Sequence, residues 1–151
     1  MFDENSCTKI AVKLDDPKLM PKRAHSTDAG ADLFSKDKHI IYPNQMCMVD
    51  TGVAVRIPVG FAGLVYSRSG QGKLRIHLAN SVGVIDSDYR GSIKVIIVNE
   101  GDEPYEITPY ATKIAQLVVT PIMLCEFQGY VGNDSDWMDT DRGTNGFGST
   151  N

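Results

Sequence analysis

Five short segments of this chain carry more glycine, polar and charged residues than simple turns require. They are residues 28–33, 66–70, 80–91, 113–117 and 142–150. The second segment contains Arg68, Ser69 and Gly70, which together offer a guanidinium group, a hydroxyl group and a flexible backbone N–H. This combination can bind phosphate, although the same three residues also occur in ordinary turns.

The fifth segment combines a cation, several glycines and an aromatic ring. Arg142, Ser149 and Thr150 supply N–H and O–H donors, and Phe147 can stack on a flat ring. Taken alone, this segment is more typical of a flexible tail than of a binding site.

The third segment has the pattern of a β-hairpin. Residues 83–91 are expected to form it, with Asp86, Asp88 and Tyr89 at the tip. A plain polar turn is the competing interpretation of the same residues.

Several stretches of the chain alternate apolar and polar residues, which predicts β-strands. In residues 8–14 the alternation places Ile10, Val12 and Leu14 on one face. The same pattern recurs in residues 53–57, 61–66, 93–98 and 113–119. Many short strands separated by glycine and proline turns predict an all-β fold such as a jelly roll, sandwich or barrel.

Helix is expected once at most. The best candidate, residues 69–78, contains Gly70 and Gly72 and has no sustained apolar face, so any helix there is short. From residue 129 the alternation is lost, and Gly, Asn, Asp, Ser and Thr dominate. We therefore expect one β-domain over residues 1–128 and a flexible C-terminal arm over residues 129–151.

Composition limits the functional classes. The chain has 151 residues, a hydrophobic content of 42% and a formal net charge of −4, which suits one domain and does not suit a protein built to grip nucleic acid. Its 3 cysteines are odd in number and widely spaced, so they indicate neither a disulfide framework nor a thiolate metal site. No signal peptide and no membrane span is evident, so the chain is expected in the cytoplasm.

In order and spacing, the five segments resemble those of the trimeric dUTPase family. The resemblance runs from about Ala24 to Thr150, and residues 83–91 and 142–150 are its most specific parts. It implies a β-clip or jelly-roll-like subunit, a homotrimer with active sites shared between subunits, and Mg²⁺-dependent hydrolysis of dUTP to dUMP and pyrophosphate. That activity keeps uracil out of DNA and supplies dUMP for thymidylate synthesis.

The resemblance also implies residue roles. Asp86 matches the aspartate that deprotonates the attacking water, and Tyr89 matches a ring beneath the deoxyribose. The main chain of residues 80–89 would pair with the uracil edge and leave cytosine with unpaired polar groups. The residues implied to bind substrate are Arg68, Ser69, Gly70, Asn80, Val84, Ile85, Tyr89, Lys94, Gln116, Arg142, Phe147, Gly148 and Ser149.

The implied Mg²⁺ would bridge the three phosphates, with phosphate and water as its main ligands. No protein side chain is expected to bind it directly, and Asp32 is a candidate for supporting its water shell or the trimer centre. Ser67 and Gln71 replace the Pro and Leu common in the family, and Asn151 replaces a final Gly. These departures affect helix packing and the last contact rather than the chemistry.

Two other functions share this fold. A dCTP deaminase, or a bifunctional deaminase–dUTPase, would need an acid–base group, usually a glutamate, beside the pyrimidine C4, and residues 80–91 contain none. A non-catalytic nucleotide-binding regulatory module is the second alternative. A capsid-like structural jelly roll is disfavoured, because it has no need of the five segments together.

Overall fold

The computed structural model describes residues 9–138 and 140–144, and within them the fold is nearly all β. The strands are β1 (Ala11–Leu14), β2 (Ala31–Phe34), β3 (His39–Ile41), β4 (Gln45–Asp50), β5 (Val53–Arg56), β6 (Phe61–Tyr66), β7 (Ile76–Leu78), β8 (Val82–Ile85), β9 (Lys94–Asn99), β10 (Tyr105–Ile107) and β11 (Lys113–Pro121). The helical turns are η1 (Pro17–Leu19), α1 (Ser69–Gly72) and α2 (Asp134–Trp137).

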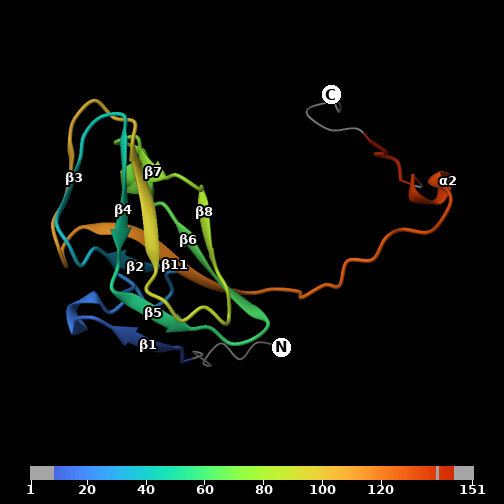
Figure 1. Ribbon diagram of the computed structural model, residues 1–151, viewed down its shortest axis with the longest axis horizontal. Coiled ribbons are helices and arrows are strands. Elements are labelled where there is room, and N and C mark those ends of the chain that lie inside the picture. Colours follow the sequence, from blue (N-terminus) through green and yellow to red (C-terminus); the bar gives the residue numbers. More distant parts are fainter. Residues whose placement is uncertain (1–8, 139, 145–151) are drawn as a thin grey trace.

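The strands form small antiparallel sheets that close around one core (Figure 1). One sheet has the order β2-β11-β6-β8, a second has the order β4-β9-β7, and β1 pairs with β5 while β3 pairs with β10. Buried side chains from both larger sheets meet in a single cluster, which includes Leu33, Val49, Val65, Ile97 and Ile114. Burial of these side chains is the main force that holds the sheets together.

Each of the five stretches with period-2 alternation contains a strand, and β5 and β9 bury one face as the alternation predicts. In β9, for example, Val95, Ile97 and Asn99 are buried while Lys94 and Ile96 are exposed. The all-β prediction is therefore confirmed, and the structure adds β2, β3, β4, β7, β8 and β10.

Two details differ from the sequence-based expectation. The described residues contain two four-residue helices rather than one at most, because α2 forms a single turn between Asn133 and Met138. Residues 83–91 are not a hydrogen-bonded hairpin with the strand that follows: β8 pairs with β6, whereas β9 pairs with β4 and β7. The chain therefore crosses from one sheet to another after residue 86, which periodicity within one segment does not reveal.

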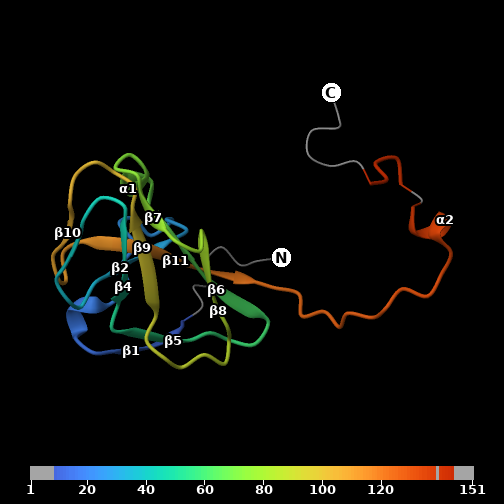
Figure 2. The same ribbon diagram turned by 45° about the horizontal axis from the view of Figure 1, so that its top comes forward.

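After β11 the chain leaves the body of the sheets. Residues 121–138 and 140–144 are exposed, and Figures 1 and 2 show them leading away as an extended segment that ends near α2. The flexibility of the arm stays a prediction. No helix among the described residues has the length and apolar character needed to cross a membrane.

Candidate active site

Four of the sequence-selected segments supply side chains to two places on the β-structure. The first place, which we call the Arg68 cluster, consists of Asp32, Arg68, Lys113 and Gln116. β2 and β11 are neighbours, β11 and β6 are neighbours, and Arg68 follows the end of β6, so the sheet order brings these residues together.

Asp32 is the centre of the Arg68 cluster. Its side chain is only 11% exposed, and its two oxygens are paired with Arg68 Nε at 2.7 Å and Lys113 Nζ at 2.8 Å. One buried carboxylate therefore orients two cations, and the trio keeps one net positive charge. Such a preformed cationic surface suits a phosphate anion. Lys113 was not among the residues implied to bind substrate, although it lies in the fourth segment.

Gln116 is held beside these charges by a hydrogen bond and by the space that Gly30 leaves. Its Nε2 donates to the Ser67 carbonyl at 3.0 Å, and its side chain crosses over Gly30. A Cβ at Gly30 would lie 2.4 Å from Gln116 Oε1, so any larger residue there would displace the carboxamide. The first segment thus contributes glycine as well as aspartate to the site.

Gln71 and Ser67, the two departures from the usual pattern, are structural replacements. Gln71 is buried: its Oε1 accepts from the Arg68 N–H at 3.1 Å, and its Nε2 donates to the Ile114 carbonyl at 3.1 Å. The Ser67 hydroxyl accepts from the Leu78 N–H at 3.0 Å. Together they fix α1, in which Ser69 and Gly70 are exposed directly after Arg68.

The second place is the Asp86 segment, residues 80–93. Ser81 adopts a left-handed backbone with φ of 61°, which turns the chain from Asn80 into β8. β8 is the last strand of its sheet, so one of its edges carries main-chain groups that no other described strand pairs with. Val84 is 64% exposed on this strand, whereas Ile85 packs against the core.

A tight turn then presents the Asp86 carboxylate and the Tyr89 ring. The Tyr89 N–H donates to the Asp86 carbonyl at 3.2 Å, and Arg90 Nη1 donates to the Ser87 carbonyl at 2.7 Å and the Tyr89 carbonyl at 2.9 Å. The Asp86 side chain is exposed. An exposed carboxylate on a braced turn is able to take a proton from water.

The Tyr89 ring folds back over Gly91. A Cβ at Gly91 would lie 2.4 Å from the Tyr89 hydroxyl oxygen, so glycine is required for this ring position. The hydroxyl donates to the Ser92 carbonyl at 3.0 Å. Lys94, at the start of β9, is exposed just beyond this loop.

Within one chain, the Arg68 cluster and Asp86 are apart. Tyr66 pairs with Val82 and Gly63 pairs with Ile85, so Arg68 and Asp86 leave opposite ends of the β6–β8 pair. Three residues of strand separate those ends, or about 10 Å. Asn80 lies at the Arg68 end and Asp86 at the far end.

The arm is described only in part. Arg142 is exposed and has an interaction partner in the structure. Phe147, Gly148 and Ser149 lie outside the described residues. Tyr130 and Trp137 contact each other in the arm, with ring centroids 4.9 Å apart.

In the first segment, a backbone hydrogen bond lowers the pKa of Asp28. The backbone N–H of His25 donates to its carboxylate at 2.9 Å, and this bond, the largest cause, lowers the pKa of Asp28 despite some desolvation. The Arg23 Nε also donates to the Asp28 carbonyl at 2.8 Å, which ties down the loop before β2.

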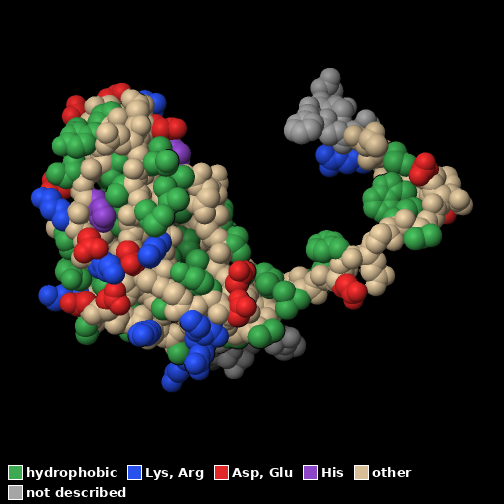
Figure 3. Space-filling model, viewed as in Figure 1, with side chains coloured by type: hydrophobic (Ala, Val, Ile, Leu, Met, Phe, Trp, Pro, Cys, Tyr) green, Lys and Arg blue, Asp and Glu red, His purple; other side chains and the backbone are tan. Residues whose placement is uncertain are grey.

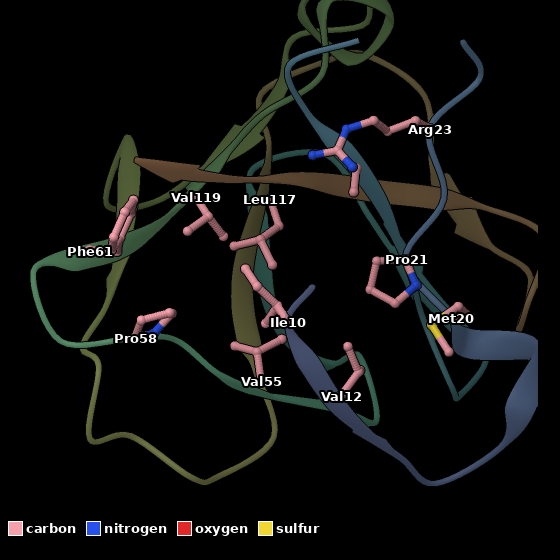
Figure 4. Close-up of a pocket in the computed structure, with 11 residues that line it drawn as sticks. Ile10, Val12, Met20, Pro21, Arg23, Val55, Pro58, Phe61, Leu117 and Val119 are labelled. Carbon is pink, nitrogen blue, oxygen red and sulfur yellow. The ribbon is translucent and has the colours of Figure 1, made fainter. Parts of the chain in front are cut away.

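Two apolar surfaces lie outside both polar places. A groove of about 380 Å³ is lined by side chains of β1, β5, β6 and β11, among them Val12, Val55, Phe61, Leu117 and Val119 (Figure 4). The stretch 122–127 exposes large apolar side chains, with Met123 86% and Phe127 97% exposed. Figure 3 shows apolar side chains continuing along the extended segment that follows the sheets.

Comparison with protein families and curated proteins gives one consistent result. The family model described as dUTPase matches residues 16–151, a range that includes all five segments. A deoxyuridine 5′-triphosphate nucleotidohydrolase of Corynebacterium jeikeium is 42% identical over 141 residues, covering 92% of this chain and 90% of the relative. One of Desulfitobacterium hafniense is 42% identical over 147 residues, covering 94% of each.

Solved structures give the same result for the fold. The dUTPase of Staphylococcus bacteriophage 80alpha with dUPNHPP superposes with a TM-score of 0.81 at 30% identity, covering 96% of this chain and 99% of that one. A mutant dUTPase of phage phi11, described with a structural Mg(II) ion, has a TM-score of 0.74 at 30% identity, covering 82% and 97%.

Proposed function

This chain belongs to the dUTPase family, and we propose that it hydrolyses dUTP to dUMP and pyrophosphate with the Arg68 cluster and the Asp86 segment as the two halves of its active site. The observation that carries the proposal is the family match over residues 16–151, which contains both halves. The geometry of each half supports a separate part of the reaction.

The Arg68 cluster would hold the triphosphate. Asp32 keeps Arg68 and Lys113 in place before substrate arrives, so binding needs little rearrangement of charge. Ser69 and Gly70 add a hydroxyl and backbone N–H groups on the exposed side, and Gln116 adds a carboxamide near the α-phosphate. Arg142, Gly148 and Ser149 would reach the γ-phosphate from the arm.

The edge of β8 would select the base. Uracil offers a carbonyl acceptor at C4 and an N3–H donor, whereas cytosine offers the opposite pair. Main-chain groups on an open strand edge cannot exchange donor for acceptor, so cytosine would leave them unpaired at a cost of about 1–3 kcal/mol for each group. Val84 and Ile85 would line this edge, and Tyr89 would pack beneath the deoxyribose.

Asp86 would act as the general base. It takes a proton from a water molecule whose oxygen forms a bond to the α-phosphorus, and the bond from that phosphorus to the bridging oxygen breaks. The electron pair leaves with pyrophosphate, and dUMP remains. Asp86 suits this role because its carboxylate is exposed on a turn braced by Arg90.

The residues present fit Mg²⁺ bound mainly by substrate. Both Asp32 oxygens are engaged by Arg68 and Lys113, and the described residues contain no group of three or more His, Cys, Asp or Glu arranged to hold a metal. Phosphate and water oxygens would therefore supply most ligands. When bound, the ion offsets charge on the phosphates and the leaving pyrophosphate.

A trimer would complete the site. Arg68 and Asp86 leave opposite ends of the β6–β8 pair, so one chain does not place both on one α-phosphate. The apolar groove and the 122–127 stretch are surfaces that a neighbouring subunit would cover. We expect the enzyme to act in the cytoplasm, because its substrate belongs to the intracellular nucleotide pool.

One assay tests the proposed function. The protein is incubated with dUTP, dCTP, dTTP and UTP in Mg²⁺, and the products are identified. Release of dUMP and pyrophosphate from dUTP alone is expected. Release of ammonia from dCTP would indicate a deaminase instead, and tight dUTP binding without any product would indicate a regulatory module.

A further inference from the structure

Tyr89 is connected by hydrogen bonds to a group of charged residues that none of the five segments contains. Its hydroxyl donates to the Ser92 carbonyl at 3.0 Å, and the Ser92 hydroxyl in turn donates to Asp50 Oδ1. The same carboxylate oxygen accepts from the Gly52 N–H at 2.9 Å. Asp50, at the end of β4, thus links the part of the Asp86 segment that follows Tyr89 to the corner between β4 and β5.

The position of Asp50 is itself fixed. Lys36 Nζ lies 3.1 Å from Asp50 Oδ2 and 3.1 Å from Asp15 Oδ2, and the Lys36 N–H donates to the Asp50 carbonyl at 3.2 Å. Desolvation alone would raise the pKa of Asp50, but the Ser92 hydroxyl, the Gly52 N–H and Lys36 together lower it, so the carboxylate is charged at neutral pH. Three separate parts of the chain therefore converge on one carboxylate.

This arrangement leaves the Tyr89 ring little freedom. Gly91 Cα lies against the phenol, since a Cβ there would approach the ring atom Cζ to 2.6 Å, and the hydroxyl is held at Ser92. Main-chain bonds hold the end of the Asp86 segment in the same place: the Ile93 N–H donates to the Val53 carbonyl at 2.8 Å, and the Thr51 N–H donates to the Ile93 carbonyl at 3.0 Å. The Ser92–Asp50 bond is a side-chain link at the same residue whose carbonyl holds the Tyr89 hydroxyl.

We propose that Asp50, acting through Ser92, is a positioning residue. It would set the distance between the Tyr89 ring and the sugar that packs on it, and thereby the preference for deoxyribose over ribose. The inference rests on the proposed function, in which this ring packs beneath the sugar. The 2′-hydroxyl of ribose adds about one heavy atom to the sugar. A Tyr89 ring that is held rigidly therefore leaves no room for ribose, whereas a ring that can shift accommodates ribose.

The test compares variants that break the link at different points. Ser92→Ala and Asp50→Asn are assayed with dUTP and with UTP, and kcat and KM are determined separately. We expect the ratio of kcat/KM for dUTP to that for UTP to fall about threefold to tenfold, the size of effect expected for one charge-assisted hydrogen bond. The kcat for dUTP should stay within about twofold, because the link does not touch the reacting atoms.

Three comparisons separate positioning from general stability. Ser92→Thr keeps the hydroxyl and should restore the ratio, and Asp37→Asn, which alters an exposed aspartate of the loop that carries Lys36, should leave it unchanged. In a Tyr89→Phe background, which lacks the ring hydroxyl, Asp50→Asn should have no further effect on the ratio. Thermal melting of each variant reports its folding.

The outcomes are distinguishable. Variants that lose thermal stability but keep the wild-type ratio, or effects that are additive in the Tyr89→Phe background, would overturn the inference while the proposed function stands. A wild-type protein that does not hydrolyse dUTP would overturn the proposed function and this inference with it.

Discussion

At the scale of single residues, the site depends on side chains whose partners lie far away in sequence. Asp32 pairs with Arg68 and Lys113, and Gln71 bonds to Ile114. The family resemblance implied that Arg68 and Gln116 both bind substrate. Residue types and spacing did not predict Lys113 as a partner of Asp32, or that Gln71 would replace an apolar residue by satisfying buried backbone groups.

The first residue-scale prediction concerns Asp86. Asp86→Asn keeps the size of the side chain but cannot accept a proton, so kcat should fall by about 10²–10⁴ while dUTP binding is retained. Steady-state kinetics and equilibrium binding of dUTP measure the two effects. Asp102→Asn, at a strongly exposed position, is the control. Turnover of Asp86→Asn within a few fold of the wild type would remove Asp86 from the role of base.

The second concerns Gln71. Gln71→Ala leaves the Arg68 N–H and the buried Ile114 carbonyl without their side-chain partner, so the free energy of unfolding should fall by about 1–3 kcal/mol. Urea unfolding at a fixed protein concentration measures it, with Gln45→Ala, an exposed glutamine, as the matched control. Equal stability of both variants would show that the Gln71 bonds contribute nothing net.

At the scale of elements, burial pattern decided which strands could be recognised from the sequence. β9 alternates because one face is buried, and in β11 Ala115 and Leu117 are buried while Gln116 and Val118 are only partly so. β2 is buried on both faces and contains Asp32, so it has no alternation, and β7 and β10 are three residues each. The pairing of β8 with β6 rather than β9 is a long-range choice that local pattern does not contain.

The charged Asp50 carboxylate, which is bonded to the Ser92 hydroxyl, the Gly52 N–H and Lys36, makes the corner between β4 and β5 sensitive to acid. The pKa of Asp50 is lowered in the folded chain from an ordinary value of 3.8, so its contribution to stability is present above that value and is lost as pH falls through the lower folded value. Asp50→Asn should therefore reduce the melting temperature most at neutral pH, and the difference from wild type should shrink below about pH 3.8. A difference independent of pH would show that charge is not involved. Asp37→Asn again serves as control.

The described part of the C-terminal arm lies outside the core. Its described residues are exposed, so deleting residues 142–151 should leave the melting temperature and dUMP affinity nearly unchanged. Hydrolysis of dUTP should become very poor, because Arg142 and the residues beyond it would contact the γ-phosphate and close over the nucleotide. Phe147→Ala should show a milder defect. Unchanged turnover would reduce the arm to a passive tail, and loss of the fold would make it structural.

At the scale of the whole molecule, the separation of Arg68 from Asp86 predicts that activity belongs to an assembly. Sedimentation equilibrium should give a trimer. Arg68→Gln and Asp86→Asn proteins should each be nearly inactive, yet refolding an equal mixture should restore activity, because some neighbouring pairs then combine the intact Arg68 of one subunit with the intact Asp86 of another. If subunits assemble at random, each of the two residues is intact in about half of the cases, so about a quarter of the sites contain both intact residues.

The mixing experiment has an internal control. Each variant is refolded alone by the same procedure, and it should recover no activity. A mixture no more active than its components would place both residues of each site in a single subunit and contradict the shared-site proposal.

The open edge of β8 bears on how this protein changes over evolutionary time. If uracil is chosen by main-chain groups, a point mutation that replaces one side chain of β8 leaves the pattern of donors and acceptors as it was. Val84 can then drift, since its side chain is exposed and takes no part in the pairing. Base preference would be inherited with the path of the backbone, and a lineage could lose it only by an insertion, a deletion or a proline that moves the strand.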